Sequence, residues 1–286
     1  MQIIQRRKIY YIISLIILVP SIISLMFQGL NLGIDFQGGT LLQVRVEAEE
    51  TTSADVRAAL HDLELGIEYN VQQSDNDFFI RTTELTQQDT EAIISGLDTA
   101  LGGVELLETE MVGGIISSEL ARDAILALII ASVLMLLYIT IRFELYFGIA
   151  AILAILHNVI LVLGVFSIFQ LEAGMPFIAA MLTVIGYSIN DTIVVFDRIR
   201  ENISMERRED TITMLNRSIM QTIVRSLNTV LTTSVVLFAV LLLGGVTLEI
   251  IAIAMLVGFI VGAYSSLFIA TPLWHDLSNK FKTKRV

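Results

Sequence analysis

The chain has 286 residues, of which 55% are hydrophobic and only 16% are charged, and its mean hydropathy is +0.75. These values lie far from the averages of soluble domains and indicate an integral membrane protein. The chain contains no cysteine, which excludes disulfides and thiolate metal sites, and its net charge of −11 disfavours nucleic acid as a partner.

Six apolar runs are long enough to cross a bilayer as helices. The first follows a basic start, is longer than the apolar core of a signal peptide and has no small-residue cleavage site after it, so we expect a retained anchor. The expected spans are residues 9–27, 122–141, 145–168, 176–197, 218–243 and 247–271. The chain then divides into a tail with the first helix (1–27), a polar domain (28–119), five further helices (120–272) and a basic tail (273–286).

The polar segment 28–119 predicts a small α+β domain. Its strands are expected at Thr40–Val46, Tyr69–Gln73, Phe78–Thr82 and Val104–Met111. We expect one helix to start at Ser53 as its cap and a second to be capped by Thr86, with Asp89 at the positive end of the helix dipole. The order βαββαβ is that of a ferredoxin-like fold, which alone indicates no function.

The polar domain is strongly acidic, with 18 acidic residues against three basic ones. A solvated surface is the simplest interpretation, and cation binding or repulsion from acidic lipid headgroups are alternatives. His61, His157 and His275 are scattered, and no phosphate-binding loop or zinc motif is present. We therefore expect no metal, no cofactor and no enzymatic activity.

Basic residues outside the apolar runs predict the orientation of the chain. Of the 18 basic residues, 13 lie in segments that six spans place on one side, which should be the cytoplasmic side. They are Arg6, Arg7, Lys8, Arg142, Arg198, Arg200, Arg207, Arg208, Arg217, Lys280, Lys282, Lys284 and Arg285. Both termini are then cytoplasmic, and residues 28–119 lie outside.

Asp191 in the fourth apolar run and Arg225 in the fifth are ionisable residues at similar depth within their spans. Such residues are costly in a bilayer and are functional candidates by default. Counted from the cytoplasmic ends, both lie roughly 9–10 Å deep. Helical spacing predicts two polar stripes that face each other and enclose a polar seam. The stripes are Thr183, Tyr187, Asn190 and Asp191 in one helix, and Arg225, Asn228, Thr229 and Thr232 in the other.

The physical chemistry of the two groups assigns them different roles. Burial disfavours a charged carboxylate, whereas a nearby guanidinium favours it, so movement of Arg225 would change the proton affinity of Asp191. Because arginine stays charged, Asp191 should carry the proton and Arg225 should act as a mobile counter-charge. The alternative is a static ion pair that fixes helix register. We also group His157 and Asn158 of the third run with this seam as supporting residues, and His157 either relays protons or is a hydrogen-bonded packing residue.

Small residues at helical spacing mark the last span. Gly258, Gly262, Ser265 and Ser266 should let two helices approach closely without binding a ligand.

Two motifs resemble the SecF family of protein-translocase subunits. Residues 33–39, Gly-Ile-Asp-Phe-Gln-Gly-Gly, are similar to the family signature G-x-D-F-x-G-G, whose matching residues are Gly33, Asp35, Phe36, Gly38 and Gly39. Residues 186–202 resemble the family's fourth-span block almost end to end. Arg225, Thr232–Thr233 and Gly244–Gly245 also lie where that family has them, and the membrane part resembles half of an RND transporter fold.

The resemblance implies that the protein pairs with SecD beside the SecYEG channel in the cytoplasmic membrane and uses the proton gradient to help unfolded polypeptides leave on the outer side. It implies functional roles in proton transport for Asp191 and Arg225. Where the family has His-Asp, this chain has His157–Asn158, and an amide cannot relay a proton near neutral pH. Sodium in place of protons, a passive scaffold and half of a small-molecule exporter remain alternatives.

Overall fold

The computed structural model describes residues 2–48, 50–63, 65–74, 76–205 and 209–282. The chain forms two compact units, residues 1–31 with 126–286 and residues 32–125. Four of the basic residues used to predict orientation, Arg207, Arg208, Lys284 and Arg285, lie outside the described residues.

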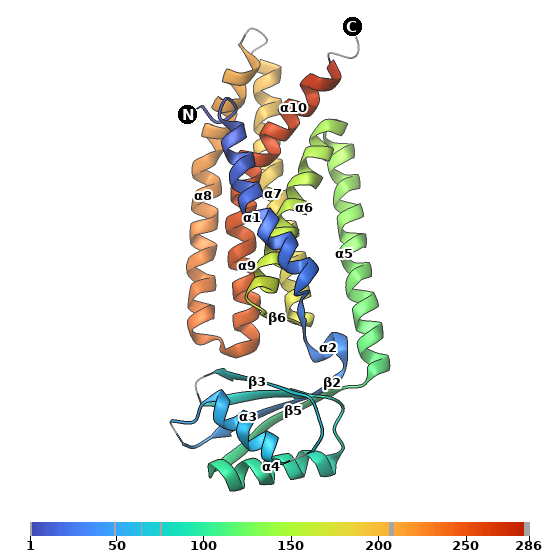
Figure 1. Ribbon diagram of the computed structural model, residues 1–286. Helices are drawn as coiled ribbons and strands as arrows, with labels where there is room; N and C mark the ends of the chain where they lie inside the picture. Colours follow the sequence, from blue (N-terminus) through green and yellow to red (C-terminus); the bar gives the residue numbers. More distant parts are fainter. Residues whose placement is uncertain (1, 49, 64, 75, 206–208, 283–286) are drawn as a thin grey trace. The chain divides into compact units, whose positions relative to one another are not determined.

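The smaller unit is a four-stranded antiparallel sheet with two helices on one face (Figure 1). Its strand order, β3-β4-β2-β5, together with the order of elements along the chain, is ferredoxin-like. Alternate residues of β2 and β4 are buried beneath the helices, among them Leu42, Val44, Phe78 and Ile80. The elements are β2 (Gly39–Val46), α3 (Ser53–Asp62), β3 (Tyr69–Ser74), β4 (Asp77–Thr82), α4 (Gln87–Leu101) and β5 (Val104–Val112).

Each of these two helices begins with a capping box. The prediction for α4 is confirmed, because the Thr86 side chain accepts a hydrogen bond from the Asp89 backbone and Asp89 bonds back. The prediction that Ser53 caps α3 is wrong, since the cap is Thr52, paired with Asp55 in the same way. Ser53 is already helical, one residue inside the cap. The hydrogen bonds from the two threonines hold the pKa values of Asp55 and Asp89 below the ordinary range.

The glycine-rich connector contains a short helix, α2 (Ile34–Gln37), which the sequence did not predict. Gly38 and Gly39 follow it with φ of +76° and +124°, a region that L side chains rarely adopt. A Cβ on Gly39 would overlap the carbonyl oxygen of Thr82, and one on Gly38 would lie 3.3 Å from the carbonyl oxygen of Val112. The pair therefore lets the chain enter β2 between the ends of β4 and β5.

The larger unit contains the membrane helices, and the prediction of six is confirmed for the described residues. They are α1 (Arg7–Phe27), α5 (Gly114–Arg142), which starts in the smaller unit, α6 (Leu145–Ile168), α7 (Met175–Met205), α8 (Thr211–Leu243) and a last span, Leu248–Asn279. That last span joins α9 (Gly245–Ser265), a π-helical segment η1 (Ser266–Ala270) and α10 (Thr271–Lys282). The two-residue strands β1 (Asn31–Leu32) and β6 (Glu172–Ala173) form a second sheet.

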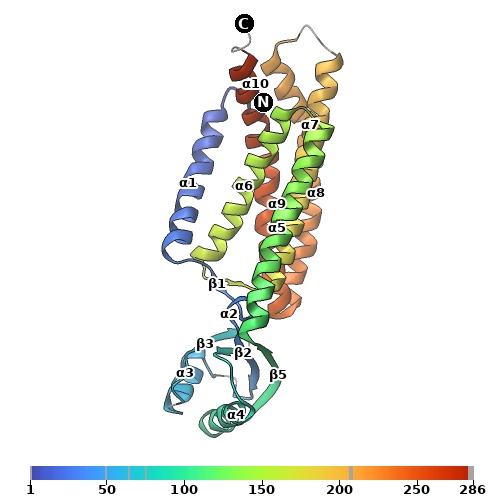
Figure 2. The same ribbon diagram turned by 90° about the vertical axis from the view of Figure 1, so that its right-hand side faces the viewer.

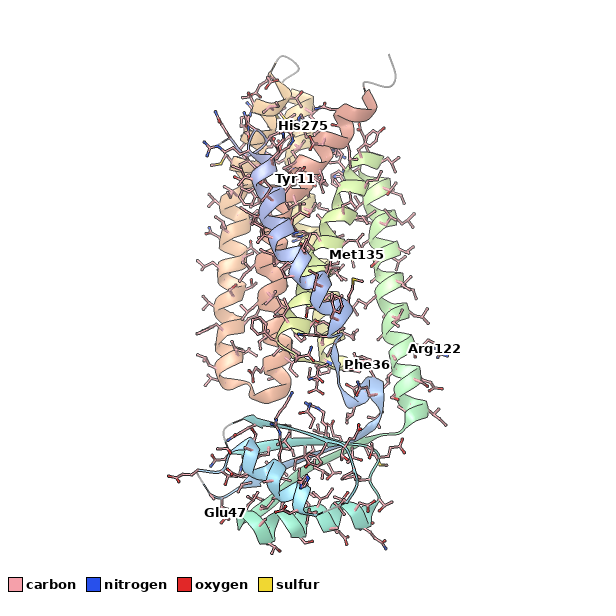
Figure 3. All side chains as sticks on the ribbon, in the orientation of Figure 1. Tyr11, Phe36, Glu47, Arg122, Met135 and His275 are labelled. Carbon is pink, nitrogen blue, oxygen red and sulfur yellow. The ribbon has the colours of Figure 1, made fainter. Side chains whose placement is uncertain are left out.

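The segment expected to be a tail from residue 273 is helical as far as Lys282. Trp274 of this segment is buried and stacks on Phe147 with 4.5 Å between ring centroids. Tyr11 (labelled in Figure 3) and Arg7 of α1 both donate to the Asp276 carboxylate of α10. These contacts extend the sixth helix by about three turns beyond the predicted end.

Helix packing in the larger unit uses small residues where backbones come close. The prediction for the last span is confirmed, since a Cβ on Gly258 would overlap Val184 and one on Gly262 would meet Ser188, both on α7. On the other side of the unit α1 lies against α6 (Figure 2), where a Cβ on Gly164 would overlap Ser21.

Candidate functional site

The site lies where α7 and α8 run antiparallel against each other. Hydrogen bonds join the two helices at several levels: Asn202 with Ser218, Asp191 with Ser226 and Tyr187 with Thr233. Val184 of α7 and Leu237 of α8 belong to one buried apolar cluster. These α8 residues recur every four to eight positions and share one face of that helix. The position opposite Asp191 on α8 is therefore residue 226.

Asp191 is half-buried and bonded by a hydroxyl group. Ser226 Oγ donates to Asp191 Oδ1 at 2.5 Å. The second carboxylate oxygen, Oδ2, is buried and has no hydrogen-bond partner among the described residues. Ser266 and Arg225 are the other polar side chains near the carboxylate. The site is thus a carboxylate bonded by one hydroxyl, with a second hydroxyl, that of Ser266, close to it.

Arg225 does not face Asp191 as the stripe pattern predicted. It is exposed, and within the described parts of α7 and α8 the two residues form no ion pair within 4.0 Å. Successive helical residues are about 100° apart around the axis, so a helix that turns Ser226 toward α7 turns Arg225 aside. The predicted depth of the two groups was similar, but depth alone does not fix the direction of a side chain.

The other predicted seam residues divide between two environments. Tyr187 is half-buried, stacks on Phe259 with 3.9 Å between centroids and approaches Thr233. The remaining stripe residues, Thr183, Asn190, Asn228, Thr229 and Thr232, are exposed, so the prediction of one enclosed seam within this chain is wrong. Helical spacing correctly placed these residues together on one face of each helix. In the single chain, no other part of the described structure packs against those faces.

His157 and Asn158 belong to a second buried polar cluster, at the contact of α6 with α1. The two ring nitrogens of His157 lie 3.0 Å from Asn158 Oδ1 and 3.1 Å from Ser14 Oγ, and Ser14 Oγ lies 3.3 Å from the Tyr264 hydroxyl. Among the described contacts, His157 and Asn158 bond within this cluster and not to Asp191, and a proton-relay role for His157 stays a prediction.

Sequence reasoning did not place Ser226 or Ser266 beside Asp191, although Ser266 was singled out as a small residue of the last span. Ser226 immediately follows Arg225, and Ser266 lies at the start of the π-helical segment, where its Oγ is 2.8 Å from Thr192 Oγ1. Single π-helical turns are rare in helices, and those that occur often lie at functional sites. The polar segment between the fourth and fifth apolar runs predicts that the two helices are antiparallel, but it does not say which residue of the fifth run faces residue 191.

The glycine signature lies elsewhere in the molecule. Gly33 precedes α2, Asp35 and Phe36 lie within it, and Gly38 and Gly39 follow it, all in the smaller unit. Among the described residues, no group of three or more histidine, aspartate or glutamate side chains could hold a metal ion. The membrane site therefore consists of Asp191, its hydroxyl neighbours and the exposed Arg225.

Comparison with known proteins identifies the family. The model for "Protein export membrane protein SecD/SecF, C-terminal" matches residues 94–280, and the SecD/SecF GG motif matches residues 23–50. The chain belongs to the SecF branch of the SecD/SecF family. SecF of Sebaldella termitidis is 38% identical over 99% of this chain and 93% of its own length. SecF of Magnetococcus marinus is 42% identical over 94% of this chain and 89% of its own length.

The fold agrees with a solved member of the family. The crystal structure of SecDF from Thermus thermophilus, a translocon-associated membrane protein, superposes with a TM-score of 0.91 and 35% identity over 98% of this chain. This chain spans only 39% of that SecDF chain. As a SecF-family protein it is a multi-pass subunit of the Sec protein translocase, and a transport protein rather than a catalytic enzyme.

Proposed function

We propose that this SecF subunit couples ion entry to protein export through Asp191, with Arg225 as the mobile counter-charge. The observation that carries the proposal is the bonding of the carboxylate, which takes a hydrogen bond from Ser226 and leaves Oδ2 buried without a partner. A carboxylate in this state can gain and lose a proton, whereas one locked in a bidentate arginine pair would stay ionised.

A static ion pair that only fixes helix register receives no support from this arrangement. Such a pair needs both charges in contact, because an isolated buried charge is costly. Here Arg225 is exposed and Asp191 is bonded by a neutral hydroxyl. Rotation of α8 would exchange Ser226 for Arg225 opposite Asp191. One proton crossing ~100 mV releases about 2.3 kcal/mol, enough to bias such a two-state element.

We infer that a SecD chain covers the exposed polar face. Without such a cover, five exposed polar side chains would lie against lipid, where unpaired polar groups are costly. They are those of Asn190, Arg225, Asn228, Thr229 and Thr232. The solved SecDF chain, of which this chain matches 39%, supports a fused or separate second half. In this assembly the polar stripes of α7 and α8 form part of an interface between two halves.

The rest of the proposed arrangement follows the distribution of charge. The chain lies in the cytoplasmic membrane with both termini inside, and residues 28–119 lie outside as the extracytoplasmic domain. Acting with SecD beside SecYEG, the subunit assists unfolded polypeptides that emerge on the outer side. The strongly acidic outer domain makes nucleic acid an implausible ligand.

The test is export into inverted membrane vesicles under an imposed gradient. We expect Asp191→Asn to abolish gradient-dependent export while the amount of assembled complex stays unchanged. Equal dependence on the gradient in the wild type and Asp191→Asn would remove Asp191 as the carrier. Imposing a pH or a sodium gradient separately decides which ion is used.

A charge swap separates carrier from scaffold. In a scaffold, Asp191→Arg combined with Arg225→Asp keeps the attraction and should restore function to either single variant. A proton carrier at residue 191 does not tolerate the swap, because arginine does not release its proton at physiological pH. We expect the double variant to assemble and to remain inactive.

A further inference from the structure

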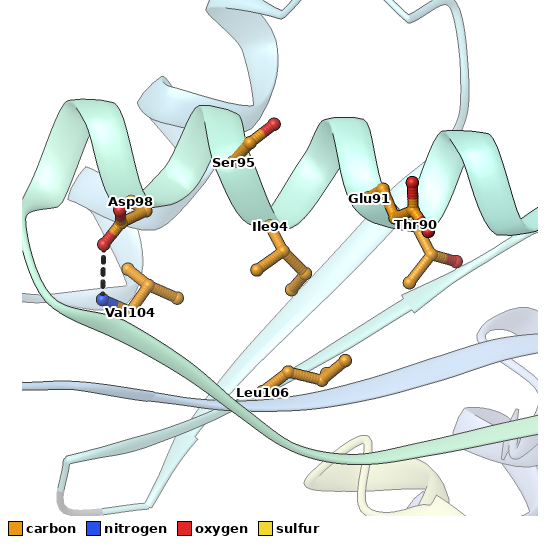
Figure 4. A pocket seen from close by; sticks show the side chains of 7 residues that line it. All are labelled: Thr90, Glu91, Ile94, Ser95, Asp98, Val104 and Leu106. Atoms are coloured by element: carbon orange, nitrogen blue, oxygen red, sulfur yellow. Dashed lines mark hydrogen bonds between the residues drawn. The ribbon is translucent and has the colours of Figure 1, made fainter.

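A groove runs along the smaller unit between α4 and the edge strand β5 (Figure 4). Its volume is about 300 Å³, and its floor is apolar, formed by Ile94, Val104 and Leu106. Glu91 and Asp98 of α4 make its rim acidic. Asp98 accepts a hydrogen bond of 2.9 Å from the backbone N–H of Val104, which ties α4 to the start of the strand and closes one end of the groove.

The strand beside the groove has an unpaired edge. β5 is last in the order β3-β4-β2-β5, and among the described strands of this sheet it pairs only with β2. An edge strand directs alternate backbone N–H and C=O groups away from its neighbour. All residues between its two ends are exposed, including Leu106 at 39% and Met111 at 63%. A nine-residue strand with this exposure is a ready template for another strand.

Natural proteins protect long edges, and β5 has only two of these protections, one irregularity of register and charged side chains. It contains no proline and no lysine, and its register is irregular at one point only, near Leu107. Its charges are three glutamates, Glu105, Glu108 and Glu110. Two copies of this strand paired edge to edge would bring these like charges together, which opposes self-association.

The register tells which side chains an added strand would meet. Leu106 lies opposite Val44 of β2, which is buried beneath the helices, so Leu106 is on the face that borders the groove. Glu105 and Glu108 lie opposite Arg45 and Gln43, on the other face. Because side chains alternate along a strand, an added segment would direct every second residue into the groove and the others toward the glutamates.

We propose that β5 binds an extended segment of unfolded polypeptide by strand addition, with apolar side chains in the α4–β5 groove and basic ones beside the glutamates. The main-chain hydrogen bonds supply affinity that is independent of sequence, and the groove and the acidic face select apolar and basic residues. The inference rests on the proposed function, since the emerging polypeptide is the occupant. It gives the outer domain a place to hold that chain.

The probe is a fluorescent octapeptide of alternating lysine and leucine, added to the full chain with SecD in lipid nanodiscs. We expect binding that is lost for the matched peptide of alternating glutamate and leucine. Methylation of alternate backbone nitrogens should weaken binding by about tenfold or more, since several main-chain hydrogen bonds are lost. Unchanged binding of the methylated peptide would overturn strand addition.

Two substitutions with the same change of charge locate the site. Leu106→Lys places a cation in the groove and should weaken binding of the lysine–leucine peptide about tenfold or more. Thr99→Lys, on exposed α4 surface outside the groove, should leave binding within about twofold. Equal effects of the two would mean that net charge alone governs binding and would contradict the proposal.

Cross-linking of the peptide to the protein locates the binding site without relying on variants that reduce binding, which can also reduce folding. The chain contains no cysteine, so single-cysteine variants are unique reporters. A bromoacetyl group on the peptide should react with Ser95→Cys at the groove rim and not with Asn70→Cys on β3, the opposite edge of the sheet. Labelling at Asn70→Cys alone would place the peptide at β3 and would contradict binding at β5.

Other occupants give different results. If SecD covers β5, the peptide binds the chain alone and fails to bind the complex with SecD. If a second copy covers it, the chain is a dimer that Leu106→Lys dissociates. Either result overturns the proposal. Asp191→Asn separates this inference from the proposed function, since it should end gradient-dependent export and leave peptide binding intact.

Discussion

Ser226 on α8 donates to Asp191 on α7, while Arg225, its neighbour in sequence, is exposed. Two consecutive residues of α8 are therefore a neutral hydrogen-bond partner of Asp191, Ser226, and a charged residue, Arg225. The two residues lie about 100° apart around the helix axis, so rotation of α8 can place either opposite the carboxylate. This relation makes α8 the mobile element of the proposed coupling.

Ser226→Ala should change the proton occupancy of Asp191. The hydroxyl stabilises the ionised carboxylate, and a hydrogen bond to a charged group contributes about 1.5–3 kcal/mol, so its loss favours the protonated form roughly tenfold or more. Reaction with dicyclohexylcarbodiimide, which modifies protonated carboxyls, should extend to higher pH in this variant.

The matched control for this experiment is Thr229→Ala, one turn further along α8. Thr229 is exposed, and its hydroxyl donates to the backbone carbonyl of Arg225. Its removal should leave the labelling profile unchanged, and Asp191→Asn should remove the labelling. A profile that moves equally for Thr229→Ala would show that general loosening of α8, and not the bond from Ser226, sets the reactivity.

Gly258→Ala should destabilise the packing of α9 against α7. The added Cβ would lie 2.9 Å from the Cβ of Val184, a buried and stiff β-branched side chain, so the helices must separate. We expect a loss of about 1–3 kcal/mol, measured as a lower thermal midpoint of the purified chain in detergent. Gly186→Ala on α7 meets no atom within 4 Å and should be neutral or slightly stabilising.

Gly39→Ala should destabilise the entry of the chain into β2. Its φ of +124° disfavours any L side chain by about 1–3 kcal/mol, and the Cβ would also overlap the Thr82 carbonyl. Amide exchange in β2 and β4 of the full chain should become faster. Gly66→Ala, at φ +65° with no atom within 4 Å, has the backbone penalty alone, and an equal effect there would contradict the role of the overlap.

Thr52→Ala should weaken the first turn of α3, whereas Ser53→Ala should not. Loss of a threonine cap costs about 1 kcal/mol, and Thr52 also holds Asp55 in the capping box. Faster amide exchange confined to the first turn of α3 would report the loss. If Ser53→Ala gave the larger effect, the assignment of the cap to Thr52 would be wrong.

The sequence determined the class of the protein, its six spans, the βαββαβ order and the two ionisable residues inside the membrane. These follow from local rules, because apolar length, strand alternation and caps act over a few residues. The helical spacing of Gly258 and Gly262 likewise predicted close packing before the partner residues Val184 and Ser188 were known.

Only the tertiary structure decided which groups meet. Residues 225 and 226 have the same depth in the fifth span, and the rotation of α8 that places Ser226 and not Arg225 against Asp191 comes from packing along the whole length of α7 and α8. His157 contacts Ser14 of α1, which is 143 residues away in sequence. Long-range contacts of this kind depend on how whole helices pack, which the pattern of a single helix does not contain.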